Sequence, residues 1–302
     1  MKHKCKDMKT VKNILTAALL LFGGVLFAQQ ESAFTLYRYH MNVVNPAYAG
    51  VDNETVLAST IRRQWTGIKD SPETQAVSFG TPVGSNIGLG ISMINDKTFI
   101  EKQTMLGVDF SYKVKISETV DLYLGIKGGG NFYNINTSGL QTYLPQSDPA
   151  LISVDRFNAN VGAGVLLKHE KYFISLSIPR MLNTKRAKSQ DGYAAIATDR
   201  PHIYLSGGYD FNLNSEASLV LKPSCMLRYV NGAPVSADIS SMIQIQHNFE
   251  IGAMYRSDEA FAGLVDFTIS KRLMVGYAYE VSTRSELASA KNTNEIFIRF
   301  KF

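Results

Sequence analysis

Cysteine is almost absent from this chain of 302 residues, which contains only two. Cys5 lies in the basic N-terminal segment, so Cys225 is left alone if that segment is removed. No intramolecular disulfide can then form. Stability must come from burial or from backbone pairing.

Long hydrophobic runs are equally scarce. One run, from Ile14 to Phe27, follows five lysines and is followed by Ala28. A membrane-spanning helix needs about 20 apolar residues, and this run is shorter. A basic head, a short apolar run and a small residue are typical of a secretory signal peptide. We expect cleavage after Ala28, with Gln29 as the new N-terminus; a membrane anchor is the alternative.

A large excess of charge of one sign is also missing from the exported part. Loss of five lysines and one aspartate with residues 1–28 lowers the formal net charge from +5 to +1. The basic character of the full chain therefore says little about its partners, and a nucleic-acid-binding role loses its main support.

Motifs for metal, phosphate or nucleophilic chemistry are lacking too. The histidines beyond the signal segment have no histidine four residues away and no nearby cysteine, which disfavours a metal site; they are His40, His169, His202 and His247. The stretch "GIKGGGN" at 125–131 precedes no helical pattern, which a phosphate-binding loop would require. We expect no catalytic, metal-binding or cofactor-binding residues. An outer-membrane hydrolase stays open as an alternative.

Alternation of apolar with small or polar residues dominates the rest of the chain. In "LGVDFSYKV", Leu106, Val108 and Phe110 alternate with Gly107 and Asp109. A period of two predicts β-strands with one apolar face. Most such runs have about 9 to 13 residues, the length that a tilted strand needs to cross a bilayer, whereas soluble strands are nearer five or six.

We predict fourteen strands, near 54–62, 74–82, 87–96, 102–115, 119–134, 156–168, 171–178, 201–211, 216–229, 234–244, 247–257, 260–269, 272–281 and 294–302. Short connections follow even-numbered strands and long ones follow odd-numbered strands. This layout is typical of an antiparallel transmembrane β-barrel in the outer membrane, with short turns on the periplasmic side. The even strand number predicts periplasmic termini, and lipid requires the first and last strands to pair.

The C-terminus indicates the same location. The last residues, "EIFIRFKF", alternate and end on an aromatic side chain. This ending looks like the signal by which outer-membrane assembly machinery recognises its clients. Its residues are Ile298, Phe300 and Phe302.

Two segments near the N-terminus carry the most distinctive residues: "LYRYHMNVVNPAYAG" at 36–50 and "RRQWTGIKDSPET" at 62–74. Asn45-Pro46 marks a turn or a break, and Gly50 permits a tight bend. Trp65, the only tryptophan, stands at a strand end, where an interfacial belt residue is the ordinary interpretation.

Together these segments resemble the PorP/SprF family of the type IX secretion system in Bacteroidetes. The Asn-Pro-Ala-Tyr-Ala-Gly end of a longer family segment is matched by Asn45, Pro46, Ala47, Tyr48, Ala49 and Gly50, with Asn42 in place upstream. Its Arg-x-Gln-Trp-x-Gly pattern, with a proline shortly after, is matched by Arg62, Gln64, Trp65, Gly67 and Pro72. Where family members often carry Asp-Gly-(Ala/Ser)-Pro, this chain reads Asp70-Ser71-Pro72 and lacks the glycine.

The resemblance implies a non-enzymatic outer-membrane barrel, without a cofactor, that serves type IX secretion and gliding motility. Its implied partners are periplasmic ring lipoproteins and a peptidoglycan-binding protein, or the C-terminal domain of a secreted adhesin, held by strand addition or by threading. The rival hypothesis is a passive porin or a transporter of lipids or small solutes.

We therefore expect three parts: a signal peptide at 1–28, a periplasmic or lumenal segment at 29–53, and a barrel at 54–302. The Trp65 stretch should close the first hairpin and pack with "NPAYAG" at the barrel wall or in the lumen. There it would serve structure or partner docking.

Overall fold

The structure is a computed structural model that describes residues 33–137, 154–185, 198–214, 218–257, 260–283 and 292–302. The expected cleavage site at Ala28 and Gln29 lies outside these residues. No helix in the described part of the chain is long and apolar enough to cross a membrane.

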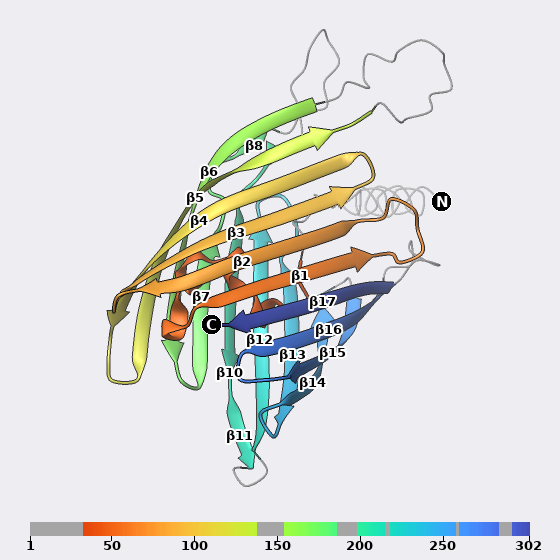
Figure 1. Cartoon of the computed structure of the whole chain (residues 1–302). Coiled ribbons are helices and arrows are strands. Elements are labelled where there is room, and N and C mark those ends of the chain that lie inside the picture. Colours follow the sequence, from red (N-terminus) through yellow and green to blue (C-terminus); the bar gives the residue numbers. More distant parts are fainter. Residues whose placement is uncertain (1–32, 138–153, 186–197, 215–217, 258–259, 284–291) are drawn as a thin grey trace, which may run out of the picture.

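The described chain is dominated by strands (Figure 1). They are β1 (Val56–Gln64), β2 (Glu73–Val83), β3 (Ile87–Thr98), β4 (Glu101–Lys115), β5 (Val120–Ile135), β6 (Val154–His169), β7 (Tyr172–Ile178), β8 (Thr184–Lys185), β9 (Thr198–Asp199), β10 (His202–Tyr209), β11 (Phe211–Asn214), β12 (Leu219–Val230), β13 (Ser236–Ile245), β14 (Phe249–Arg256), β15 (Ala260–Thr268), β16 (Leu273–Ser282) and β17 (Asn292–Lys301). Four 3-10 turns precede them: η1 (Tyr37–Tyr39), η2 (Met41–Val43), η3 (Pro46–Tyr48) and η4 (Val51–Asn53).

All barrel strands pair antiparallel with their neighbours, and the sheet closes on itself. β1 pairs with β17 from Val56 opposite Lys301 to Gln64 opposite Thr293. On the far side, β10 joins β7 to β12. β11 continues β10 in the same register on β12 after a break at Asp210, so the two act as one strand. The barrel thus has fourteen strands, and the prediction is confirmed. The short β8 and β9 form a separate pair in the connection between β7 and β10.

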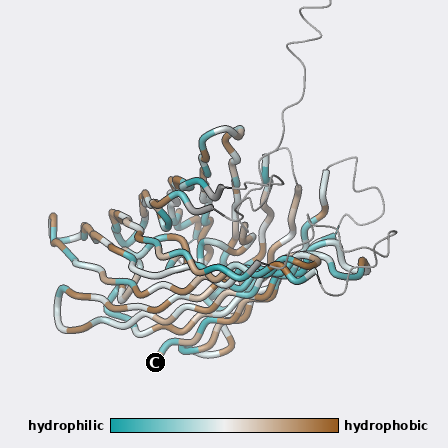
Figure 2. The backbone as a smooth tube through the Cα atoms, turned by 90° about the horizontal axis from the view of Figure 1, so that it is seen from above, coloured by the Kyte–Doolittle hydropathy of each residue, from teal (hydrophilic) through white to brown (hydrophobic). Residues whose placement is uncertain are grey.

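Apolar side chains cover the outside of the barrel. Val108 and Ile126 are 61% and 62% exposed, whereas Asp109, the neighbour of Val108 on the inward face, is 0% exposed. Figure 2 shows the same alternation of hydrophobic and hydrophilic residues along the strands. A soluble protein would not leave such a surface in water, but a lipid bilayer solvates it.

The two ends of the barrel differ in their connections. At the end that we call the short-turn end, the connections include residues 84–86, 170–171 and 246–248. The opposite, long-loop end carries 65–72, 136–153 and 283–291. Three connections there are shorter than the predicted pattern, at 99–100, 231–235 and 257–259. Phe99 makes the first of these tight turns with a left-handed φ of 54°.

The last strand seals the barrel beside the first. Ile298 faces outward, and the Phe302 backbone N–H donates to the Thr55 carbonyl at 3.0 Å. The Phe302 ring packs on Phe79 and Phe300. Recognition of this ending by an assembly machine stays a prediction.

Candidate functional site

Residues 34–53, here called the lumenal segment, lie inside the barrel and fill much of its lumen (Figure 1). Phe34, Leu36 and Tyr37 are buried there in one apolar cluster with inward side chains of the strands. The segment hydrogen-bonds to β1, β2, β4, β5, β6, β7, β12, β14, β16 and β17. Since these strands surround the lumen, the segment is anchored on every side.

The lumenal segment runs lengthwise from the long-loop end to the short-turn end. Thr35 bonds to Glu295, which lies near the long-loop start of β17. Gly50 lies against Thr81 and Pro82, near the short-turn end of β2. The free ends of β1 and β17 both lie at the short-turn end, as an even strand number requires. Before β1, the described chain begins at the long-loop end and runs back through the lumen, and the N-terminus, which we predict to be periplasmic, lies outside the described residues.

Buried charges hold the start of the segment. The Glu295 carboxylate accepts the backbone N–H of Thr35 at 2.7 Å and that of Leu36 at 2.9 Å. Arg62 forms ion pairs with Glu295 at 3.3 Å and with Glu280 at 2.9 Å. Charge-assisted bonds of this kind are about twice as strong as neutral ones.

The same charge network continues along the wall. Arg256 bridges Glu280 at 3.1 Å and Asp238 at 2.9 Å, and Arg228 also reaches Asp238 at 2.9 Å. Every one of these groups is buried. A buried cation that loses its partner is costly, so the six residues act as a unit. We call them the outer charge network: Arg62, Arg228, Asp238, Arg256, Glu280 and Glu295.

Midway along the lumen, His40 bonds to hydroxyls on two neighbouring strands. Its Nδ1 lies 2.8 Å from Thr60 Oγ1 and its Nε2 lies 2.8 Å from Ser78 Oγ. Burial, helped by the positive charges of Arg299 and Lys127, lowers the pKa of His40 from 6.5 to about 3. The imidazole is therefore neutral and serves as a two-sided hydrogen-bonding contact rather than as a charge.

The Asn45-Pro46-Ala47 motif forms a capped turn pressed onto the wall. Asn45 Oδ1 accepts the Ala47 N–H at 2.9 Å, and Pro46 occupies the first position of η3, the arrangement that favours a helical turn. Asn45 Nδ2 donates to Ser175 Oγ at 2.8 Å. The strands admit this turn because they carry glycine: a Cβ at Gly125 would lie 2.2 Å from the Ala47 nitrogen.

Gly50 makes the tight bend expected of it, and the structure adds a close contact with the wall. Its φ of +67° is left-handed, and an added Cβ would lie 2.8 Å from the Thr81 carbonyl oxygen. One residue earlier, the Ala49 carbonyl accepts the Ser111 hydroxyl at 2.6 Å. The bend at Gly50 thus directs the chain out of the lumen and into β1.

Asn42 and Tyr48 line a recess between the lumenal segment and the barrel wall that reaches the short-turn end. Both atoms of the Asn42 amide are buried without a hydrogen-bond partner among the described residues. The Tyr48 ring packs on the apolar cluster, and burial raises the pKa of its hydroxyl. The residues of the first motif, from Asn42 to Gly50, therefore make their contacts mostly within the lumen.

The second motif divides between the lumen and the rim. Arg62 enters the outer charge network, whereas the neighbouring Arg63 is exposed and pairs with Glu73 at 2.7 Å. The Gln64 N–H donates to the Pro72 carbonyl at 2.9 Å, closing the first hairpin. Gly67 has a left-handed φ of 102° in this turn.

Trp65 does not pack with "NPAYAG", and this expectation is wrong. Trp65 lies half-buried beyond β1 at the long-loop end. Ala47 and Gly50 lie against Gly125 and Thr81, nearer the opposite end. The prediction failed because Arg62, three residues before Trp65, is the residue that points inward and reaches Thr35, at 2.7 Å.

Several functional residues escaped the sequence reasoning. The lumenal charges each stand alone among small residues, so no motif joins them; Asp238, Arg256, Glu280 and Glu295 are examples. Their common signal is a charge on the polar side of an alternating strand. Among the described residues, no group of three or more His, Cys, Asp or Glu side chains is placed to hold a metal ion.

The solved structures that resemble this chain include outer-membrane barrels. A monoaromatic hydrocarbon channel, CymD, aligns with a TM-score of 0.51 at 10% identity, covering 90% of this chain and 94% of that chain. A FadL homologue from Pseudomonas aeruginosa aligns with a TM-score of 0.49 at 9% identity, covering 85% of this chain and 91% of that chain. At these identities the likeness concerns the fold alone. No curated protein matches the chain.

The family comparison covers nearly the whole molecule. The model described as "Type IX secretion system membrane protein PorP/SprF" matches residues 26–300. That range includes the lumenal segment and almost the entire barrel. The chain therefore belongs to the PorP/SprF family of type IX secretion system membrane proteins and resides in the outer membrane.

Proposed function

We propose that this protein is a non-enzymatic barrel that binds the secretion apparatus or a secreted surface adhesin and supports adhesin export or surface attachment. The observation that carries the proposal is the lumen filled by the chain's own N-terminal segment. A passive porin needs an open aqueous passage, whereas this lumen holds buried residues anchored to strands on all sides. Family membership supplies the secretion context.

The proposed partner surface is the long-loop end, which faces the cell exterior if short turns are periplasmic. The connections at this end include the longest of the barrel. Trp65, which is half-buried, and Arg63, which is exposed, lie on the rim of this end. These two residues are available to a partner, whereas Asn45, Pro46 and Ala47 are buried in the lumen away from this rim.

The test is deletion of the gene followed by surface proteomics on intact cells. We expect one or a few surface proteins to disappear, and chemical crosslinking on wild-type cells should capture the same proteins or periplasmic ring lipoproteins with the barrel. Unchanged surface proteins, together with faster uptake of small solutes by wild type than by the deletion strain, would support the porin instead.

A conduit for small apolar solutes is a second candidate. CymD, whose fold this chain shares, is a monoaromatic hydrocarbon channel, and this chain has an apolar pocket in its lumen. The conduit predicts that wild-type cells take up a small aromatic hydrocarbon faster than deletion cells do. Uptake at the same rate in both strains would rule out the conduit hypothesis.

A further inference from the structure

A recess with a basic lining lies inside the barrel at the short-turn end, between the lumenal segment and the ends of β12 to β17. Its volume is about 240 Å³. One water molecule needs about 10 to 15 Å³ on this measure, so the recess has room for a group of several heavy atoms. Cations dominate its charged lining residues, which are Lys222, Glu250, Lys271, Arg272, Arg299 and Lys301.

Three of these cations are paired, and they share two carboxylates. Lys222 donates to Glu250 at 2.7 Å. Glu54, which precedes β1, pairs with both Lys301 at 2.7 Å and Arg299 at 3.3 Å. One carboxylate therefore serves two cations on β17.

The other two cations, Lys271 and Arg272, have no such partner. Both are exposed in the turn between β15 and β16, and neither side chain forms a hydrogen bond or ion pair with another described residue. One more carboxylate is near, that of Asp266, which stands opposite Glu250 on the neighbouring strand. Even when Asp266 is counted as charged, the positive charges at the recess exceed the negative ones by two.

Hydrogen-bond donors at the recess also lack acceptors. The Ser270 Oγ accepts the backbone N–H of Arg272 at 3.3 Å and that of Leu273 at 3.1 Å, which leaves its hydroxyl hydrogen free to donate. The Nε of Arg299 is buried and has no hydrogen-bond partner within the described part of the chain. The lining thus offers both charge and donors to an anion.

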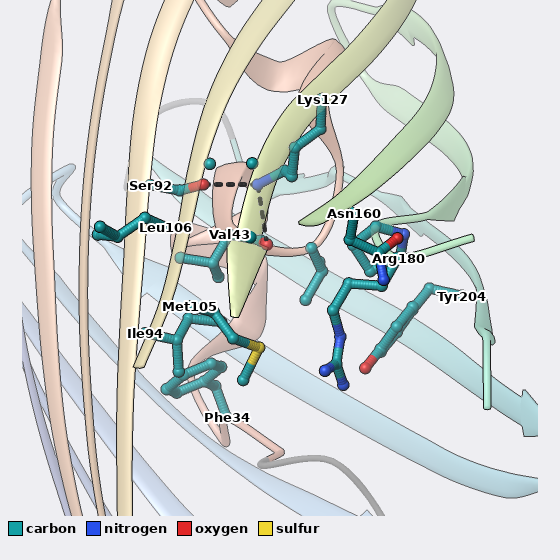
Figure 3. Close-up of a pocket in the computed structure, with 15 residues that line it drawn as sticks. Phe34, Val43, Ser92, Ile94, Met105, Leu106, Lys127, Asn160, Arg180 and Tyr204 are labelled. Carbon is teal, nitrogen blue, oxygen red and sulfur yellow. Dashed lines mark hydrogen bonds between the residues drawn. The ribbon is translucent and has the colours of Figure 1, made fainter. Parts of the chain in front are cut away.

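Cations deeper in the lumen differ, because their charge is balanced within the protein. Lys127, shown in Figure 3, donates to Ser92 Oγ at 2.5 Å and pairs with the Asp109 carboxylate at 3.2 Å. The outer charge network joins three arginines to three carboxylates. The unbalanced charge at the short-turn end is therefore a local feature.

We propose that this basic recess binds a phosphate group. A phosphate monoester carries about −1.5 to −2 charges at pH 7 and three acceptor oxygens, which matches the excess of two cations and the free donors. Arginine and lysine bind phosphate through charge-assisted hydrogen bonds, and a cleft with low-dielectric walls concentrates anions of the opposite sign. A carboxylate brings one charge and two oxygens, so it would satisfy less of the lining.

Two sources offer this chemistry. The short turns of outer-membrane barrels face the periplasm, so soluble phosphate esters have access to the recess from there. The turn that carries Lys271 and Arg272 also stands at the membrane surface, where the headgroup of an inner-leaflet lipid can reach over it. The site lies at the end opposite the proposed partner surface, so this inference goes beyond the proposed function.

The test uses the full-length protein in dodecyl maltoside, a detergent without phosphate, and one probe for each source. Inorganic phosphate is titrated by calorimetry at constant ionic strength, with acetate as the matched carboxylate. We expect saturable phosphate binding and at least about tenfold weaker binding of acetate. Dioleoyl phosphatidate is added in a second experiment, with dioleoylglycerol as the matched lipid without phosphate, and native mass spectrometry counts the lipids retained.

Two variants remove the unpaired charges, and a third is the matched control. Arg272→Gln and Lys271→Gln should each weaken phosphate binding by about tenfold, because each deletes a charged donor. Both residues are exposed and unpaired among the described residues, so both variants should fold. Lys69→Gln removes the same charge from an exposed turn at the long-loop end and should bind phosphate as wild type does.

The outcomes decide both the site and its source. Wild-type affinity in Arg272→Gln and Lys271→Gln, equal weakening by Lys69→Gln, or acetate binding as tight as that of phosphate would each overturn the proposal. Retention of phosphatidate over dioleoylglycerol, reversed by inorganic phosphate, would support the site and assign it to a lipid headgroup. Phosphate binding without such retention would support the site and assign it to a soluble phosphate ester.

Discussion

Arg62 on β1 stands directly opposite Glu295 on β17, across the seam where the barrel closes. The two side chains form a buried ion pair at 3.3 Å, and the same Glu295 carboxylate holds the backbone of Thr35. The seam and the lumenal segment therefore share one acceptor. Since the segment passes through the lumen, closure of the seam and anchoring of the segment depend on the same carboxylate.

Replacing Glu295 with glutamine should loosen the lumenal segment. The change removes the charge that balances Arg62 and weakens the bonds to Thr35 and Leu36. Loss of one member of a buried ion pair costs about 3 kcal/mol or more. We expect Glu295→Gln to show ion conductance in planar bilayers well above that of wild type.

The matched control for this change is Glu73→Gln, which removes the half-buried partner of the exposed Arg63 at the rim. Exposed pairs contribute about 0 to 1 kcal/mol, so this variant should conduct as little as wild type. High wild-type conductance, equal to that of Glu295→Gln, would show that the segment does not block the lumen, and low conductance in both would show that Glu295 does not hold the segment in place.

Glycines on β5 provide a steric test with a control on the same strand. A Cβ at Gly125 would lie 2.2 Å from the Ala47 nitrogen, whereas one at Gly128 would meet nothing within 4 Å. We expect Gly125→Ala to displace the Asn45-Pro46-Ala47 turn and to lower the urea midpoint in micelles, with a cost of about 1 to 3 kcal/mol. Gly128→Ala should unfold at the wild-type midpoint, and equal midpoints for the two variants would contradict the close contact.

The direction of the lumenal segment can be tested by cysteine labelling on intact cells. Ala33 is half-buried at the long-loop end, and Lys271 is exposed in a short turn at the other end. In a Cys225→Ser background, Ala33→Cys should react with a membrane-impermeant maleimide from outside. Lys271→Cys should react only after the outer membrane is permeabilised. The reverse result would invert the assigned orientation.

Two buried aspartates should respond in opposite ways to the same substitution. Asp238 accepts bonds from Arg228 and Arg256, so Asp238→Asn leaves two buried cations short of a counter-charge. Neither oxygen of Asp266 has a hydrogen-bond partner among the described residues, so Asp266→Asn removes a poorly solvated acid. We expect Asp238→Asn to destabilise the barrel by about 3 kcal/mol and Asp266→Asn to be neutral or stabilising. Heat-dependent mobility on SDS gels measures both, and similar losses would contradict this assignment.

The strands could be predicted from the sequence because lipid imposes a simple rule on them. Val108 must face outward and Asp109 inward, and this constraint repeats along every strand. The course of the lumenal segment could not be predicted, because its partners are distant in sequence: Thr35 and Glu295 lie 260 positions apart. Nothing local marks either residue. Trp65 drew attention as a rare residue, while Arg62, three residues earlier, makes the contact to the segment.

His40 offers a test of the lumenal segment through pH. The pKa of its imidazole is about 3 in the folded protein, against 6.5 when unperturbed. Between these values the unfolded chain binds a proton that the folded protein does not, so stability falls as the pH falls below about 6.5. Each pH unit in this window lowers the free energy of unfolding by up to about 1.4 kcal/mol.

The variant His40→Gln keeps a donor and an acceptor for Thr60 and Ser78 but does not titrate. We therefore expect the urea midpoint to drop more steeply in wild type than in His40→Gln between about pH 7 and pH 4.5. Carboxylates elsewhere titrate in both proteins, so the difference between the two curves isolates His40, and parallel curves would mean that the imidazole gains protons as readily in the lumen as in water.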